Sequence, residues 1–319
     1  MGILPLFEQP SGFDRASVAA KLGALAQQNV WIGTSSWKYE GWLGQIYTAE
    51  RYLARGKFSR KQFEEKCLAE YSETFPIVCG DFAFYQFPSE AFWEKLFRSA
   101  PPRLRYVFKV PEEITRKSFP VHERYGSRAG LKNPGYLDPV LFAESFLKPL
   151  EPYSSQIPLL IFEFGTFSQR NYPGVDEFLQ DLDPFLEAIP RTHRYSVEIR
   201  NREFLTPQYF ECLRDHGAAH VFNAWARMPE LHRQVAIAEA YTADFTVTRG
   251  LLAFGRAYEK AVEAFSPYDR IQEENPGARR SIRDLIERAR RVRESAYIFV
   301  NNRLEGNAPM TIEGILQDV

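Results

Sequence analysis

Short apolar runs alternate with amphipathic stretches along most of this chain. Eight of the runs have the length and the β-branched or aromatic content of buried strands, at residues 30–35, 77–82, 104–109, 159–163, 195–199, 218–222, 245–248 and 297–300. Between them, apolar residues recur at helical spacing, as Phe178, Leu182 and Phe185 do. This alternation is typical of βα units around a parallel sheet, and eight units predict an α/β fold of the (β/α)8 TIM-barrel type.

Signals at the ends of elements support a single barrel domain. Asp138-Pro139 and Thr206-Pro207 each pair a capping side chain with proline at the first helical position. Ahead of the first predicted strand, apolar residues at helical spacing predict an extra N-terminal helix; they are Val18, Leu22 and Leu25. We therefore predict a helical extension over residues 1–29 and one barrel domain over residues 30–319. An open doubly wound sheet is the alternative, but no GxGxxG or P-loop motif supports its nucleotide-binding forms.

Composition and charge exclude several classes of protein. The 319 residues are 45% hydrophobic and 15% aromatic with a net charge of −1, so no global field attracts nucleic acid or membranes. No apolar run has the length of a membrane span. Cys67, Cys79 and Cys212 lack CxxC spacing, which argues against disulfides or a thiolate metal site and predicts a cytoplasmic protein. The five histidines lie away from the predicted strand ends, so we predict no metal and no cofactor.

Five segments in the same order resemble a known family. They are Ile32-Gly33-Thr34-Ser35-Ser36-Trp37 followed by Trp42 and Tyr47, the stretch from Tyr71 to Pro88, Phe108-Lys109-Val110-Pro111 with Ile114-Thr115, Val197-Glu198-Ile199-Arg200, and Val300-Asn301-Asn302 with Gly306-Asn307-Ala308. Together they resemble the YecE-like family, a domain of unknown function, from about residue 30 to the C-terminus. The sequence departs from the family pattern at Cys79-Gly80-Asp81, at Arg116 and at Glu163. The resemblance implies a TIM-type barrel and no established reaction.

Functional side chains of a (β/α) barrel lie at the C-terminal ends of its strands and in the loops that follow. This rule selects the following side chains: Ser35, Trp37, Asp81, Tyr85, Lys109, Glu163, Glu198, Arg200, Asn223, Arg249, Asn301 and Asn302. Among them we predict Lys109 and Glu198 as catalytic residues. We predict substrate-binding roles for seven others, which are Trp37, Asp81, Tyr85, Arg200, Arg249, Asn301 and Asn302.

The charged candidates allow two interpretations each. Desolvation in a barrel mouth lowers the pKa of a lysine, which would make Lys109 a base, a Schiff-base amine or an anion clamp. The alternative is a structural ion pair with Glu198. Glu198 and Arg200 are two residues apart and share one face of their strand, so they could act as an acid/base and an anion holder. Their alternative is a mutual salt bridge.

Two further segments are candidates for a functional role. Arg249, Gly250 and Gly306 follow the last two predicted strands, where many barrels bind phosphate, and a short helix predicted to begin near Thr311 could contribute N–H groups. The alternative there is an ordinary turn and a capped helix.

Residues 117–135 form the longest irregular stretch, which predicts a functional lid or a disordered loop.

These candidate residues indicate a class of function and not a specific reaction. We predict an enzyme for a small anionic or phosphorylated substrate, sugar-like or nucleotide-like, with Lys109, Arg200 and Arg249 holding the anion; it would be a hydrolase, lyase or isomerase. The alternatives are a non-catalytic module that binds phosphate or nucleic acid, and a scaffold with a vestigial site. Nucleic acid is not favoured, because the arginines of residues 279–293 accompany an apolar stripe that runs from Ile282 to Val292. The oligomeric state is left open.

Overall fold

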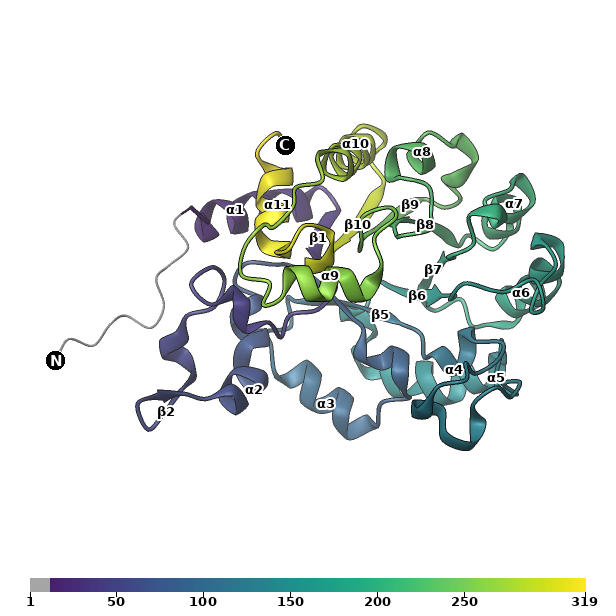
Figure 1. Ribbon diagram of the computed structural model, residues 1–319, viewed down its shortest axis with the longest axis horizontal. Coiled ribbons are helices and arrows are strands. Elements are labelled where there is room, and N and C mark those ends of the chain that lie inside the picture. Colours follow the sequence, from purple (N-terminus) through teal and green to yellow (C-terminus); the bar gives the residue numbers. More distant parts are fainter. Residues whose placement is uncertain (1–11) are drawn as a thin grey trace.

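Eight parallel strands close into a barrel in the computed structural model, which describes residues 12–319 (Figure 1). Every predicted strand forms, with ends within two residues of the predicted ones. The barrel strands are β1 (Val30–Thr34), β4 (Ile77–Gly80), β5 (Arg105–Lys109), β6 (Leu159–Glu163), β7 (Arg194–Glu198), β8 (Ala219–Ala224), β9 (Phe245–Gly250) and β10 (Ser295–Val300). Each pairs with its neighbours in chain order, and β1 closes the ring between β4 and β10. The predicted TIM-type fold is confirmed.

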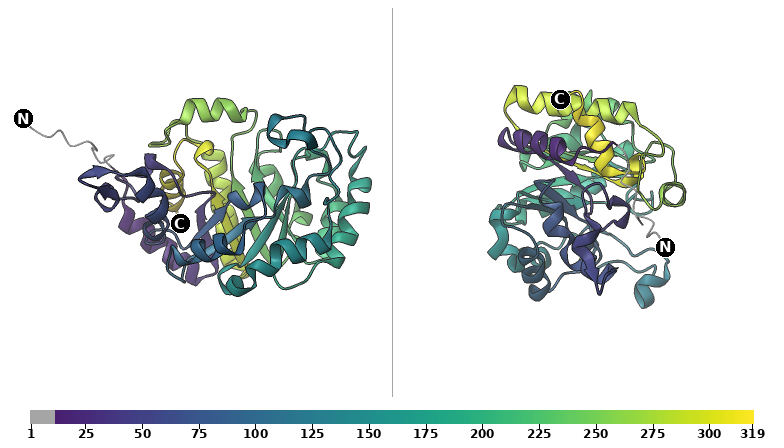
Figure 2. Two further views of the ribbon diagram at one scale, coloured as in Figure 1. Left: turned by 90° about the horizontal axis from the view of Figure 1, so that it is seen from below. Right: turned by 90° about the vertical axis from the view of Figure 1, so that its left-hand side faces the viewer.

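Helices surround the barrel on its outside (Figures 1 and 2). They are α1 (Arg15–Gln27), α2 (Arg60–Tyr71), α3 (Glu90–Arg98), α4 (Glu112–Thr115), α5 (Pro139–Phe142), α6 (Val175–Ala188), α7 (Pro207–Asp215), α8 (Leu231–Val235), α9 (Tyr258–Phe265), α10 (Pro276–Val292) and α11 (Ala308–Leu316). As predicted, Asp138 caps α5 and Thr206 caps α7. Sequence patterns did not predict the small hairpin of β2 (Leu53–Ala54) and β3 (Lys57–Phe58).

The predicted N-terminal helix is α1, which buries Val18, Leu22 and Leu25. It packs beside the C-terminal helix α11, where the Lys21 ammonium donates to the carbonyl oxygen of Leu316 at 2.5 Å (Figure 2). The first part of the predicted extension, residues 1–11, lies outside the described residues. Among the helices of residues 12–319, none is long and apolar enough to cross a membrane.

The loop at residues 117–135 is folded onto the barrel and is not the disordered segment that the prediction allowed. Backbone hydrogen bonds join Phe119 to Leu131 at 2.9 Å, which closes the loop as an irregular hairpin. Arg124 donates to both carboxylate oxygens of Glu112 on α4, and Arg128 binds Glu113 at 2.8 Å. These ion pairs fix the hairpin beside the barrel mouth.

Helix α10 has the predicted mixture of a charged face and an apolar stripe, with one correction. Ile282, Leu285 and Ile286 are buried, but Val292 is 42% exposed. The helix ends at Val292, and Arg293 turns into the left-handed region with φ of 61°, so this last valine points away from the core.

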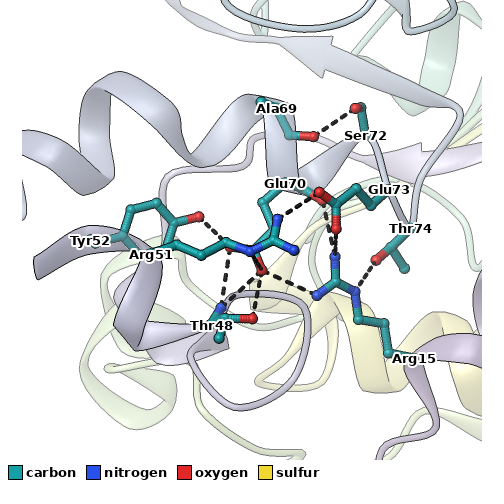
Figure 3. Close-up of polar contacts among 9 residues, drawn as sticks. All are labelled: Arg15, Thr48, Arg51, Tyr52, Ala69, Glu70, Ser72, Glu73 and Thr74. Atoms are coloured by element: carbon teal, nitrogen blue, oxygen red, sulfur yellow. Dashed lines mark hydrogen bonds and ion pairs between the residues drawn. The ribbon is translucent and has the colours of Figure 1, made fainter.

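A buried carboxylate ties the N-terminal helix to the first βα unit (Figure 3). Glu70 on α2 is 2% exposed and accepts hydrogen bonds from the Thr48 backbone N–H and hydroxyl and from the Tyr52 hydroxyl. Arg15 of α1 reaches the same carboxylate at 3.2 Å, and Arg51 does so at 3.4 Å. The charge of Glu70 is therefore paired, and its contacts link α1 and the segment from Thr48 to Tyr52 to α2.

We expect Glu70→Gln to lower the free energy of unfolding by about 2–3 kcal/mol, because hydrogen bonds to a buried charge are lost. Urea denaturation measures this change. Glu73→Gln is the matched control: Glu73 binds the same two arginines but is 40% exposed, so its loss should cost below about 1 kcal/mol. Equal effects of the two substitutions would contradict the role of burial.

Because His220 on β8 is buried, we expect the free energy of unfolding to depend on pH in the acid range. Burial lowers the pKa of its imidazole to about 3, whereas in an unfolded chain it is about 6.5. Between these values only the unfolded state binds the proton, so stability falls as the pH falls from about 6.5 toward 3, by up to about 1.4 kcal/mol per pH unit. His220→Gln should flatten the dependence of the unfolding free energy on pH in this window. His122→Gln, which changes an exposed histidine, should not.

Candidate functional site

Charged side chains form the top layer of the barrel interior. Lower down, the inward positions are apolar, for example Val107 on β5 and Val247 on β9. Because successive strand residues point to opposite faces, the residue two positions later also points inward. At the mouth this rule places the following side chains inward: Asp81, Lys109, Glu163, Glu198 and Arg249. These residues together with Arg200 are called the mouth cluster.

Arg249 is the hub of the mouth cluster. Its Nη1 lies 2.7 Å from Glu163 Oε2 and 2.5 Å from Glu198 Oε2, and its Nη2 lies 3.3 Å from Asp81 Oδ1. The side chain is 1% exposed. Burial alone would lower the pKa of this guanidinium, but the carboxylates of Glu198 and Asp81 raise it well above its usual range. One arginine therefore joins carboxylates from three different strand ends.

Lys109 and Arg200 complete the cluster. Lys109 Nζ lies 3.4 Å from Asp81 Oδ1 and 3.2 Å from Glu163 Oε2. Arg200 Nη2 lies 2.7 Å from Glu198 Oε1 and 3.2 Å from Glu163 Oε1. The three cations and three carboxylates of the cluster cancel, so it carries no net charge when all six are ionised.

Lys109 does not have the lowered pKa that the sequence led us to expect. Burial does lower the pKa, but the neighbouring carboxylates of Asp81 and Glu163 outweigh burial and raise it above the ordinary value. The ammonium also lies 4.2 Å from the centre of the Phe84 ring. The raised pKa favours the charged ammonium and supports the ion-pair interpretation, and a catalytic role for Lys109 stays a prediction. Its carboxylate partners are Asp81 and Glu163, and not the predicted Glu198.

The carboxylate of Glu163 is held in its ionised form. Burial alone would raise its pKa, but Arg200, Lys109 and Arg249 lower it well below its usual range. This residue is one of the positions at which the sequence departs from the pattern of the resembled family. Here the carboxylate balances cations that an amide would leave without a counter-charge.

Glu198 is the most deeply buried member of the mouth cluster, and its predicted catalytic role stays a prediction. Its side chain is 0% exposed, because Arg200 and Arg249 cover it from both sides. The mutual salt bridge with Arg200, which the sequence left as the alternative, is present. Asp81 has the most exposed side chain of the cluster, at 29%, compared with 11% for Glu163. Of the six charges, Asp81 is the one best placed to contact a ligand.

A groove leads from Asp81 outward between α2 and α3. Its volume is about 480 Å³, which suits a small molecule. Its wall residues come from both helices and from the loops after β1 and β4: Ser36, Trp37, Lys38, Lys61, Glu64, Glu65, Leu68, Asp81, Phe82, Phe92, Lys95, Leu96 and Ser99. Apolar side chains such as Leu68 and Leu96 are buried, whereas the three lysines are exposed.

Trp37 and Tyr85 occupy different places around this opening. Trp37 is 5% exposed and packs edge-on against Phe82, and its indole Nε1 has no hydrogen-bond partner among the described residues. Tyr85 is 58% exposed, with the Arg124 guanidinium 5.0 Å from its ring centre. A role for either residue in binding stays a prediction.

Asn301 and Asn302 hold the C-terminal loop together. The Asn301 side chain accepts from the backbone N–H of Arg303 at 3.0 Å. Asn302 Oδ1 accepts from the Trp42 indole at 3.1 Å and from the Ala308 N–H at 2.8 Å. These contacts fix the loop, and a substrate-binding role for either asparagine stays a prediction.

The predicted phosphate position after the last two strands is closed. Helix α11 begins at Ala308, before the predicted start, and the N–H groups of its first turn bind within the protein. The Ala308 N–H donates to Asn302, the Met310 N–H to the side chain of Asn307, and the Thr311 N–H to the Asn307 carbonyl. The capped helix, which the sequence left as the alternative, is therefore the observed structure.

A second hollow was missed by the sequence analysis. It has a volume of about 400 Å³ and lies beside Arg200, lined by Thr166, Arg202, Glu203, Ala226, Arg227 and Phe254. The Arg200 guanidinium lies 3.6 Å from the ring centre of Trp225, immediately after β8. The strand-end rule could have selected Trp225. Lys61 and Lys95 in the groove lie on helices, where that rule does not apply.

The fold and the cluster define a TIM-type barrel with a charge-balanced mouth. The chain belongs to the DUF72 family, described as "Protein of unknown function DUF72", whose model matches residues 31–319. A DUF72 family protein from Thermotoga maritima is 22% identical, with a TM-score of 0.58 over 90% of this chain and 97% of that one. One from Enterococcus faecalis is 16% identical, with a TM-score of 0.58 over 90% and 95%. The similarity to these structures shows the fold. No curated protein matches the sequence.

The paired burial of Arg249 and Glu198 predicts a strong energetic coupling between them. Arg249→Met alone should destabilise the protein by about 3–5 kcal/mol, because buried carboxylates lose their common partner. Adding Glu198→Met removes one of the carboxylates left behind, so the double variant should be less destabilised than the sum of the two single variants, with a coupling of roughly 1–3 kcal/mol. Urea denaturation of all four proteins measures this cycle.

The exposed pair Arg60–Glu64 provides the control cycle, since its side chains are 78% and 49% exposed. Its coupling should stay below about 0.5 kcal/mol. Additive effects at Arg249 and Glu198 would show that the mouth cluster does not act as one unit.

Proposed function

We propose that this DUF72 protein, of the YecE-like type, is an enzyme for a small anionic or phosphorylated substrate, sugar-like or nucleotide-like. The observation that carries the proposal is the placement of Asp81. Its Oδ1 is fixed by Lys109 at 3.4 Å and Arg249 at 3.3 Å, while the side chain remains 29% exposed and lines the groove between α2 and α3. A carboxylate that is oriented by buried cations and open to a small-molecule cavity is a candidate general acid/base.

The anion is held in the groove and not by the mouth cations. Lys109, Arg200 and Arg249 already bind carboxylates, so their predicted role as anion holders becomes one of positioning. Lys38, Lys61 and Lys95 of the groove form no ion pair within residues 12–319. Of the carboxylates that line the same groove, Glu64 is bound by Arg60 and Asp81 by Lys109 and Arg249, which leaves the charge of the lysines available to a phosphate or carboxylate group. The substrate body would lie on the apolar wall between them.

This arrangement suggests a division of labour in the reaction. Asp81 would take a proton from the substrate or from an attacking water molecule. The Lys109 ammonium, whose pKa is raised by the neighbouring carboxylates of Asp81 and Glu163, would stabilise negative charge that develops next to Asp81. Glu163 and Glu198 would act as positioning residues that hold the cations in place. Hydrolysis, elimination and isomerisation all use such a proton transfer, so the proposal covers these three reaction types.

A second candidate is a non-catalytic binding module, and the charge balance of the mouth favours it. Because the cations and carboxylates there cancel, the cluster could serve the fold alone while the groove lysines bind an anion. Nucleic acid remains the less favoured ligand of such a module, since the net charge of the chain is −1.

Ligand binding should raise the melting temperature. Inorganic phosphate, ribose 5-phosphate, glucose 6-phosphate and AMP are the probes, and we expect at least one of them to stabilise the protein. Lys61→Ala and Lys95→Ala should each reduce that shift, because they remove unpaired groove charges. Lys66→Ala is the matched control, since Lys66 lies on the same helix but outside the groove. No shift with any probe would favour a scaffold.

Asp81→Asn separates the two candidate functions. An enzyme should convert a stabilising probe to product, detected by 31P NMR, and Asp81→Asn should slow conversion by about 10²–10⁴-fold while retaining the thermal shift. A binding module should show the shift without conversion in either protein. Equal conversion by the wild type and by Asp81→Asn would contradict the assignment of Asp81.

A further inference from the structure

Four side chains with metal-binding atoms meet on the outside of the barrel, between α6 and α7, which lie side by side in Figure 1. Asp183 and Glu187 are one turn apart on α6. Cys212 and His216 are one turn apart at the end of α7. Because residues four apart on a helix share a face, each helix directs both of its side chains toward the other helix. The site lies apart from the mouth cluster and does not depend on the proposed function.

The ligand atoms of three of these residues are close enough to share one ion. His216 Nε2 lies 2.7 Å from Asp183 Oδ1, and Cys212 Sγ lies 3.8 Å from the same oxygen. One ligand atom from each of the three lies within 4.8 Å of the others. Ligands about 2.0–2.3 Å from a tetrahedral zinc ion lie about 3.3–3.8 Å from each other, so small side-chain rotations suffice.

The second imidazole nitrogen is an independent indication. The His216 side chain is 8% exposed, yet its buried Nδ1 has no hydrogen-bond partner among the described residues. The nearest acceptor is Glu187 Oε2, at 3.5 Å, which also receives Arg191 at 3.2 Å. Metal-bound histidines typically donate their other N–H to such a carboxylate, which fixes the ring and its tautomer. A slight approach of Glu187 would produce that arrangement.

We propose that Asp183, Cys212 and His216 bind one divalent transition-metal ion of the zinc class, with Glu187 orienting His216. A set of one sulfur, one nitrogen and one oxygen ligand selects zinc, cobalt or a similar ion over magnesium or calcium, which require oxygen ligands. Binding releases the Cys212 thiol proton to solvent and forms a metal–thiolate bond. Asp183 is 62% exposed, so the fourth position faces water.

The ion would join two consecutive βα units. Helix α6 precedes β7 and α7 precedes β8, so a bond across the helices stabilises the folded barrel, and this stabilisation rises with the logarithm of the metal concentration above the dissociation constant. The competing explanation is a plain ion pair of His216 with Asp183, which needs neither the thiol nor a metal.

Cobalt is the probe that separates these explanations, because its thiolate charge-transfer and d–d absorption bands report the ligands. Titration of the whole protein with Co²⁺ should give one bound ion per chain, with a thiolate band that Zn²⁺ abolishes. Cys212→Ser and His216→Gln should remove the bands, and Glu187→Ala should weaken binding by roughly 10–100-fold. His232→Gln, which alters an exposed histidine outside the site, should bind cobalt as the wild type does.

Melting temperatures without metal establish that each variant folds. If Cys212→Ser fails to fold, Asp183→Asn replaces it, since that side chain is largely exposed. Zn²⁺ should raise the melting temperature of the wild type and of His232→Gln, and should leave that of the ligand variants unchanged. Absence of a thiolate band, or bands that persist in both Cys212→Ser and His216→Gln, would overturn the proposal.

Discussion

Mutual neutralisation of buried charge is the constraint on which the top of this barrel depends. A carboxylate or guanidinium that loses contact with water costs several kcal/mol unless an opposite charge lies close to it. Each carboxylate of the mouth cluster touches at least two cations, and Arg249 touches all three carboxylates. The three partners of Arg249 come from β6, β7 and the end of β4, none of which neighbours β9, so its ion pairs cross the mouth, whereas Lys109 and Arg200 bind carboxylates of their own or adjacent strands. The cluster therefore fixes the strand ends relative to one another as well as balancing their charge.

The same balance determines what the mouth can do. A neutral cluster with fully engaged cations exerts little attraction on an anion, so recognition must come from charges outside it. The groove between α2 and α3 supplies such charges next to the one cluster side chain that is substantially exposed. Asp81 owes this exposure to the early end of β4 at Gly80, after which the chain turns and leaves the carboxylate at the inner end of the groove. A side chain at Gly80 would collide with Phe82 and Phe108, at 2.8 and 2.9 Å from a Cβ, so this close turn needs glycine.

Sequence patterns predicted the barrel well because its strands are buried on both faces and therefore appear as apolar runs. The strand-end rule also selected every member of the mouth cluster, since the alternation of inward and outward residues continues past the last apolar position. It could not show which member remains accessible. That depends on how far the side chain of Arg200 reaches over Glu198, and on whether carboxylates outweigh desolvation at Lys109. Both are properties of the assembled mouth and not of any single strand.

Other features escaped prediction because they join side chains of two successive helices that are separated in the sequence by a whole strand and its loops. Lys61 and Lys95 meet across a groove, and Cys212 meets Asp183 across a helix pair, with no local motif to mark either contact. The groove and the surface between α6 and α7 differ in the charged side chains that they contain. The groove is lined by three lysines that form no ion pair among the described residues, together with the carboxylates of Asp81, Glu64 and Glu65, whereas the surface between α6 and α7 combines carboxylates with a thiol and an imidazole, which is why we propose an anion for the first and a cation for the second. Because the charges of the barrel mouth cancel, each of these two proposals rests on the side chains of its own site and not on a net charge of the mouth.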